Sequence, residues 1–145
     1  MIDRKYDVLA SDNWLIYEFV SIGPKGRIPK MVIYQHIEGN LYNLAFGDKD
    51  SESGNIDDLV VSDNQDTEIV LATVASTLFD FFENYNGTIV FAKGSTHSRT
   101  RLYRRHLNIL LEHIEQNFLL LGELNGEIER FKKNKEYTSF LITKL

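Results

Sequence analysis

Residues 14–47 read WLIYEFVSIGPKGRIPKMVIYQHIEGNLYNLAFG, and this stretch decides the fold. It holds three runs rich in β-branched and aromatic residues, each about as long as an ordinary strand. Two turn signals separate the runs. In Gly23-Pro24-Lys25-Gly26 proline presets one φ angle and glycine tolerates a positive one, while Glu38-Gly39-Asn40 has the length of a tight hairpin loop. The pattern predicts an antiparallel meander of three strands, at 14–22, 30–37 and 41–47.

The sequence after this meander predicts two helices and further strands. Residues 48–63 are polar and lack any periodic pattern, which favours a surface loop. Apolar residues then recur at helical spacing from Val70 to Tyr85, with Asp63 or Asn64 as a candidate N-cap and Asn86-Gly87 as a stop signal. The remaining predicted elements are a strand at 88–93, a helix at 98–115, a hairpin of strands 118–124 and 127–131 around Asn125-Gly126, and a last strand at 137–145.

Together these elements predict one α+β domain, residues 1–145, in the order β-β-β-α-β-α-β-β-β, with two helices packed on a largely antiparallel sheet. A chain of 145 residues with 43% hydrophobic residues is long enough to bury a core. The absence of cysteine excludes disulfides and thiolate catalysis. The N-terminus lacks the apolar stretch of a signal peptide, and the longest apolar run, Phe118 to Leu121, cannot span a bilayer. We therefore expect a cytoplasmic protein that does not engage membranes.

Charge is distributed unevenly along the chain. The formal net charge is −5, which argues against a general nucleic-acid binder. Residues 48–68 hold eight acidic side chains and one lysine, whereas residues 93–106 hold five Lys or Arg and no acid. This asymmetry is compatible with a local basic site on an acidic protein. The alternative is that the acidic loop is merely solvated and that the arginines form weak surface ion pairs.

The basic segment at 91–106 reads FAKGSTHSRTRLYRRH and is the clearest chemical signal in the chain. A predicted strand leads into a glycine, two hydroxyl residues and an arginine-rich helix start. This arrangement favours anion binding, because free backbone N–H groups and the positive end of a helix dipole converge there. Glycine permits close backbone approach, hydroxyls donate hydrogen bonds, and arginine offers a bidentate fork. The candidate ligand-binding residues are Lys93, Gly94, Ser95, Thr96, Ser98, Arg99, Arg101 and Tyr103.

Arg99 has a special position in this segment. At about 100° per residue it lies on the apolar side of the predicted helix, unlike the arginines that follow it. An inward guanidinium needs an anionic partner, because burying an unpaired charge is costly. The partner would be a ligand phosphate or carboxylate, or an internal acid such as Asp48 or Asp57. In the alternative, purely structural interpretation, Thr96 or Ser98 caps the helix and Arg99 is an internal clamp.

His97 is the candidate catalytic residue, because an imidazole beside an anion site could transfer protons. The alternative is that it is an incidental loop histidine. The basic turn at 23–30 could close over an anion held by Arg99, or could be a solvated hairpin tip. The segment at 94–99 is not a Walker A loop, and no dinucleotide fingerprint or zinc motif is present. We therefore expect neither a cofactor nor a metal.

Three segments together resemble a family of small bacterial proteins described only as a domain of unknown function. They are Tyr42-Asn43-Leu44-Ala45-Phe46-Gly47-Asp48, Ser62-Asp63-Asn64, and the run from Gly94-Ser95-Thr96 through Arg99-Thr100-Arg101-Leu102-Tyr103-Arg104. The resemblance covers most of the chain. It implies a small bacterial protein, but it implies no activity, substrate or catalytic residue.

Three functions fit these residues, and the sequence leaves open whether the protein is an enzyme. The first is a module that binds a phosphorylated small molecule, a nucleotide or nucleic acid at the basic segment. The second is a metal-independent ribonuclease or toxin, in which His97 transfers protons, Arg99 stabilises charge and Tyr103 orients the substrate. The third is an antitoxin or immunity-type protein that uses its acidic loop to cover a basic partner. Exposed strand edges would also permit a homodimer.

Overall fold

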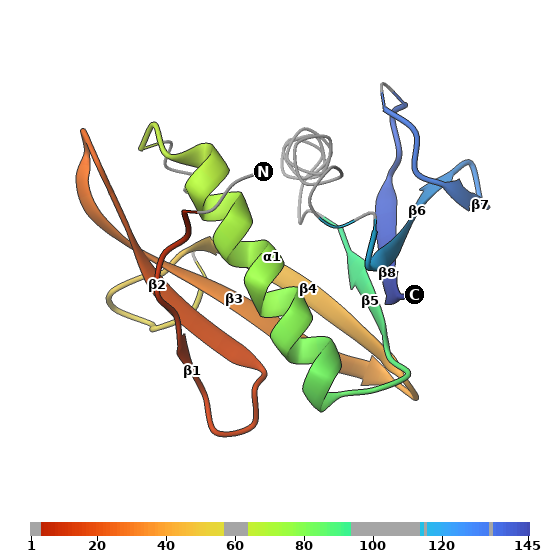
Figure 1. Cartoon of the computed structure of the whole chain (residues 1–145), viewed down its shortest axis with the longest axis horizontal. Helices are drawn as coiled ribbons and strands as arrows, with labels where there is room; N and C mark the ends of the chain where they lie inside the picture. Colours follow the sequence, from red (N-terminus) through yellow and green to blue (C-terminus); the bar gives the residue numbers. More distant parts are fainter. Residues whose placement is uncertain (1–3, 57–63, 94–113, 115, 134) are drawn as a thin grey trace.

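The computed structural model describes residues 4–56, 64–93, 114, 116–133 and 135–145. In these residues eight strands form one sheet in the order β1-β2-β3-β4-β5-β8-β6-β7, and one helix, α1, lies across a face of that sheet (Figure 1). The elements are β1 (Leu9–Ala10), β2 (Ile16–Gly23), β3 (Gly26–Glu38), β4 (Leu41–Asp48), α1 (Thr67–Asn84), β5 (Ile89–Ala92), β6 (Phe118–Leu124), β7 (Glu127–Arg130) and β8 (Ser139–Lys144).

The predicted meander is confirmed as β2, β3 and β4, which pair antiparallel in chain order. Gly23 pairs with Gly26 across a two-residue turn, and Gly26 has a φ of 88°, a left-handed conformation that glycine adopts without strain. The second hairpin turns at Gly39 and Asn40, as the sequence predicts. The turn between β6 and β7 is also confirmed, because Asn125 and Gly126 have φ angles of 54° and 80°, as a type I′ turn requires.

The helix α1 covers the first half of the sheet through an aromatic cluster. Phe81 is fully buried and stacks on Tyr34 of β3, with ring centroids 4.2 Å apart and an interplanar angle of 7°. Its ring also contacts Tyr42 of β4 at 5.2 Å and Tyr85, beyond the helix end, at 5.0 Å. One helix face therefore packs against side chains from two neighbouring strands. Large buried rings of this kind dominate the energetics of a core.

The second half of the sheet is assembled out of chain order. β5 pairs in parallel with β4 and antiparallel with β8, and β8 pairs in turn with β6. The helix α1 connects β4 to β5, since two parallel neighbours need a crossover connection. β8 thus lies between β5 and the β6–β7 hairpin, so the part of the sheet that comes last in the chain holds an interior position.

The predicted fold class needs correction. We expected an α+β domain with two packed helices, but the described residues are mostly β and contain one helix. The predicted helix at 98–115 lies outside the described residues except for Ile114, which is helical, as predicted, and fully buried. Strand content is higher than expected because β3 begins at Gly26, where the turn residues already pair with β2. The sequence pattern does not predict β1, because a strand of two residues is too short to show an alternation of apolar and polar side chains.

The start of α1 also differs from the expectation. The N-cap is Asp66, and its side chain makes no capping hydrogen bond. Asn64, a candidate cap, instead fixes the turn between β2 and β3. Its Oδ1 accepts a hydrogen bond from the Lys25 backbone N–H at 2.6 Å, and its Nδ2 donates to the Gly26 carbonyl at 2.9 Å. Tertiary contacts thus take precedence over the local capping preference.

We expect the protein to lose stability above about pH 10, in part through Tyr34. Burial is the main cause that raises the pKa of the Tyr34 phenol, which also hydrogen-bonds Thr77 at 2.8 Å. Burial likewise raises the pKa of Tyr17. A group whose folded pKa is raised contributes stability that is complete below its unfolded pKa and is lost as the pH rises above it. Urea unfolding of wild type and Tyr34→Phe between pH 8 and 11.5 measures this effect.

At neutral pH the Tyr34→Phe variant should be about 1 kcal/mol less stable, because it lacks the bond to Thr77. Above pH 10 the difference should close by up to about 1.4 kcal/mol per pH unit, because phenylalanine cannot ionise in the unfolded chain. A difference that stays constant across this range would contradict the assignment.

Candidate functional site

The basic segment begins where β5 reaches its carboxyl end. β4 and β5 run in parallel, with Leu41 opposite Ile89 and Asn43 opposite Phe91, so both strands end toward the same edge of the sheet (Figure 1). β5 ends at Ala92, and the next residue, Lys93, is exposed. The predicted strand before the basic segment is therefore confirmed, and it lies inside the sheet between β4 and β8.

Lys93 belongs to the described part of the chain, and the other predicted site residues do not. The candidates outside the described residues are Gly94, Ser95, Thr96, His97, Ser98, Arg99, Arg101 and Tyr103. Asp57, one of the internal acids considered as a partner of Arg99, also lies outside them.

Asp48, the other internal acid, ends β4 as part of a buried ion pair. Its Oδ1 lies 2.5 Å from Nζ of Lys30, and the two side chains are 8% and 6% exposed. The two residues are direct cross-strand neighbours, since Lys30 on β3 pairs with Asp48 on β4. The carboxylate is thus already engaged by Lys30, which the sequence places both at the start of the predicted strand 30–37 and in the basic turn at 23–30.

A cluster of polar groups ties residues 6–9, here called the N-terminal arm, to the sheet and to the start of α1. The Asp66 carboxylate accepts hydrogen bonds from Tyr6 Oη and Ser21 Oγ, each at 2.5 Å. Asn64 Nδ2 donates to the same Ser21 hydroxyl at 3.2 Å. Because these groups satisfy one another, the cluster is best explained as a structural latch.

Tyr6 has a second role in the latch, because its hydroxyl also bonds the main chain of β2. It accepts a hydrogen bond from the Ile22 N–H at 3.0 Å and lies 3.2 Å from the Ile22 carbonyl. Burial and the bond to Asp66 raise the pKa of the Tyr6 phenol. The side chain therefore occupies main-chain groups at the edge of β2 that would otherwise be open to another strand.

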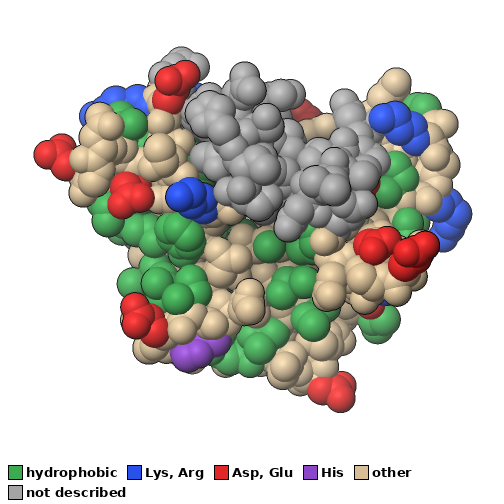
Figure 2. Space-filling model, turned by 180° about the vertical axis from the view of Figure 1, so that it is seen from behind, with side chains coloured by type: hydrophobic (Ala, Val, Ile, Leu, Met, Phe, Trp, Pro, Cys, Tyr) green, Lys and Arg blue, Asp and Glu red, His purple; other side chains and the backbone are tan. Residues whose placement is uncertain are grey.

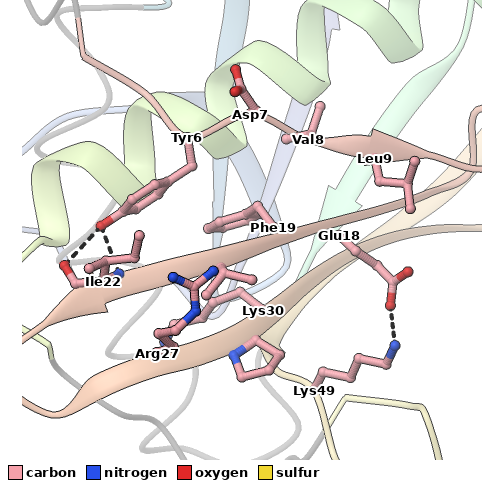
Figure 3. A pocket seen from close by; sticks show the side chains of 12 residues that line it. Tyr6, Asp7, Val8, Leu9, Glu18, Phe19, Ile22, Arg27, Lys30 and Lys49 are labelled. Atoms are coloured by element: carbon pink, nitrogen blue, oxygen red, sulfur yellow. Dashed lines mark hydrogen bonds and ion pairs between the residues drawn. The ribbon is translucent and has the colours of Figure 1, made fainter.

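An open groove of about 610 Å³ lies beside this arm (Figure 3). Residues 6–9 form one wall, β2 forms the floor, and residues of β3 together with Lys49, directly after β4, form the other wall. Figure 3 shows the guanidinium of Arg27 extending over the groove, and Lys49 paired with Glu18. Sequence reasoning missed this groove, because it arises where the arm separates from β2 and no local pattern reports that separation.

The face of the sheet opposite α1 has a different character. Figure 2 shows hydrophobic side chains over its middle, while charged side chains lie mostly toward the rim. Strand alternation explains the apolar part: Ile33 lies between the core residues Val32 and Tyr34 and is only half-buried.

A family profile covers almost the whole sequence. The profile, described as a family of unknown function (DUF6934), matches residues 3–145. The chain belongs to the DUF6934 family. This confirms the resemblance to a domain of unknown function, while the bacterial origin stays a prediction. No curated protein and no solved structure was found to match the chain.

Two further findings concern the described part of this DUF6934 chain. No three His, Asp or Glu side chains among the described residues converge as a metal site would require. Within the same residues, no helix combines the length and the apolar character needed to cross a membrane. The chemical groups brought together here are therefore the Lys30–Asp48 pair, the latch around Asp66, and the groove under Arg27.

Proposed function

We propose that this protein binds a phosphorylated ligand, a nucleotide or a short segment of nucleic acid, at the junction that follows β5. The observation that carries the proposal is the parallel pairing of β4 and β5, with β5 ending at Ala92. In open sheets with parallel neighbours, ligands bind beyond the carboxyl ends of the strands. The sequence Gly94-Ser95-Thr96-His97-Ser98-Arg99 begins at such an end.

The charge of the segment supports the same ligand class. Five Lys or Arg occur without an acid between residues 93 and 106, in a protein with a formal net charge of −5. A local positive field on an acidic protein attracts anions to one place without binding polyanions everywhere. Lys93, exposed at the end of β5, is the first of these cations.

The residue types fit recognition of a phosphate. Gly94 lets an anion approach the main chain, and Ser95, Thr96 and Ser98 supply hydroxyl donors. Arg99 supplies two parallel N–H donors, which match two phosphate oxygens. In this proposal Arg101 and Tyr103 extend the site along the segment, toward the sugar or base of a nucleotide.

The Arg99→Ala variant tests this proposal. We expect its affinity for ATP and for a short single-stranded RNA to fall about 10- to 100-fold, because a hydrogen-bonded charge pair with phosphate contributes about 1.5–3 kcal/mol. Isothermal titration calorimetry at fixed salt measures the loss. The matched control is Arg130→Ala, which removes the same charge from an exposed position on β7.

Equal affinities of the wild type and Arg99→Ala would refute the site assignment. A loss of the same size in Arg130→Ala would show a general charge effect instead of a site. RNA cleavage during the titration, abolished by His97→Ala, would replace the binding proposal with the ribonuclease alternative.

A further inference from the structure

The groove beside the N-terminal arm contains a cation with no acidic partner among the described residues. Three basic side chains line it, and two of them are neutralised: Lys49 by Glu18, and Lys30 by Asp48. Arg27 forms no ion pair with any described carboxylate. Its guanidinium is the cation of the lining that no ion pair of the described residues neutralises.

Arg27 is held over an apolar floor. It pairs directly with Ile22 across the β2–β3 ladder, while Val20 pairs with Pro29 one step further along the same face. Ile22 is 54% exposed, so its side chain adds apolar surface beside the guanidinium. The groove therefore offers one positive charge at the edge of a continuous apolar surface.

The wall opposite Arg27 contains two apolar side chains beside Asp7. Leu9, on β1, is 71% exposed and lines the groove together with Val8. β1 pairs with β2 only as far as Leu9, opposite Glu18, and the arm then turns toward α1, where the Tyr6 N–H bonds Thr73 Oγ1 at 2.9 Å. This divergence from β2 opens the groove, and the bond of Tyr6 to the helix holds it open.

We infer that this groove binds a small amphipathic carboxylate, a molecule with one carboxylate group and an unbranched apolar chain. A volume of about 610 Å³ is in the range of small-molecule sites. One free guanidinium matches one planar carboxylate. A doubly charged phosphate monoester fits less well, because the Asp7 carboxylate also lines the groove and repels additional negative charge. The apolar chain would cover Val20, Ile22 and Leu9.

The inference is tested with octanoate as the probe, by NMR titration of the full chain. We expect Arg27→Gln to weaken octanoate binding about fivefold, the upper range for an exposed charge pair. Octanol, which lacks the charge, should bind the wild type about as weakly as octanoate binds the variant. Affinity should rise from hexanoate to decanoate, because each added methylene buries more apolar surface. The matched control is Arg130→Gln, on the other end of the sheet.

A charge series at Leu9 provides a second test that does not depend on Arg27. Because Leu9 is largely exposed, substitutions there should leave the fold intact. Relative to Leu9→Gln, the Leu9→Lys variant should bind octanoate more tightly and Leu9→Glu more weakly. Equal binding across this series, equal binding of octanol and octanoate, or unchanged affinity in Arg27→Gln would each overturn the inference.

The lining of this groove and the candidate residues of the proposed phosphate site have no residue in common. If both exist, Arg99→Ala should keep wild-type octanoate binding and Arg27→Gln should keep wild-type ATP binding. The failure of one proposal is therefore distinguishable from the failure of the other.

Discussion

Replacing Asp48 with alanine should lower the free energy of unfolding by about 3–5 kcal/mol, because a buried ammonium group would lose its carboxylate. Lys30 Nζ lies 2.5 Å from Asp48 Oδ1, and both side chains are less than a tenth exposed. Removing one partner of such a pair costs more than the pair itself contributes, since the remaining charge stays desolvated. Urea unfolding at pH 7, followed by far-UV circular dichroism, measures the change.

Two variants separate the burial of charge from the loss of packing. The double variant Lys30→Met, Asp48→Leu should recover most of the lost stability, because a well-packed apolar pair can replace a buried ion pair. Glu18→Ala breaks the half-exposed pair with Lys49 and should change stability by about 1 kcal/mol or less. If Asp48→Ala lowers the free energy of unfolding no more than Glu18→Ala does, the buried Lys30–Asp48 pair does not stabilise the fold as predicted.

Phe81→Ala should be destabilising to a similar extent, by about 3–5 kcal/mol. The ring is fully buried and contacts Tyr34, Tyr42 and Tyr85 at centroid distances between 4.2 and 5.2 Å. Truncation would remove this contact area and leave a cavity between α1 and the sheet, because rigid rings on three sides cannot collapse into the space. The same urea unfolding experiment measures the loss.

The matched control is Phe79→Ala, two residues earlier on α1. Phe79 is 44% exposed and contacts Phe118 on one side, with centroids 4.8 Å apart. Its truncation should cost about 1 kcal/mol, since solvent already covers much of the ring. Equal losses from the two substitutions would mean that α1 does not use Phe81 as its main anchor to the sheet.

Local signals in the sequence were sufficient to predict most of the elements. The turns at 23–26, 39–40 and 125–126 were predicted correctly, because glycine, proline and asparagine have specific backbone preferences that do not depend on the rest of the fold. The helix α1 was predicted because its apolar residues repeat at helical spacing over 18 residues. These features depend on residues close together in the chain.

Long-range features could not be predicted in the same way. The predicted N-cap of α1, Asp63 or Asn64, was wrong. The N-cap is Asp66, and Asn64 instead hydrogen-bonds the distant β2–β3 turn. The parallel pairing of β4 with β5 and the insertion of β8 have no local signal. Arg27 was recognised only as part of a basic turn, and its position in a groove depends on where residues 6–9 leave β2. At the proposed phosphate site, the strand before the basic segment was predictable: it was predicted at 88–93, and β5 spans Ile89–Ala92.

The position of β8 has a consequence for synthesis of the protein on the ribosome. β8 joins β5 to β6, so these two parts of the sheet cannot be joined until residues 139–144 have left the exit tunnel. Until then β5 and β6 each lack a neighbour that they have in the finished protein. Unpaired edges of this kind are prone to aggregate, so the nascent chain is exposed to aggregation until β8 takes its place between β5 and β6.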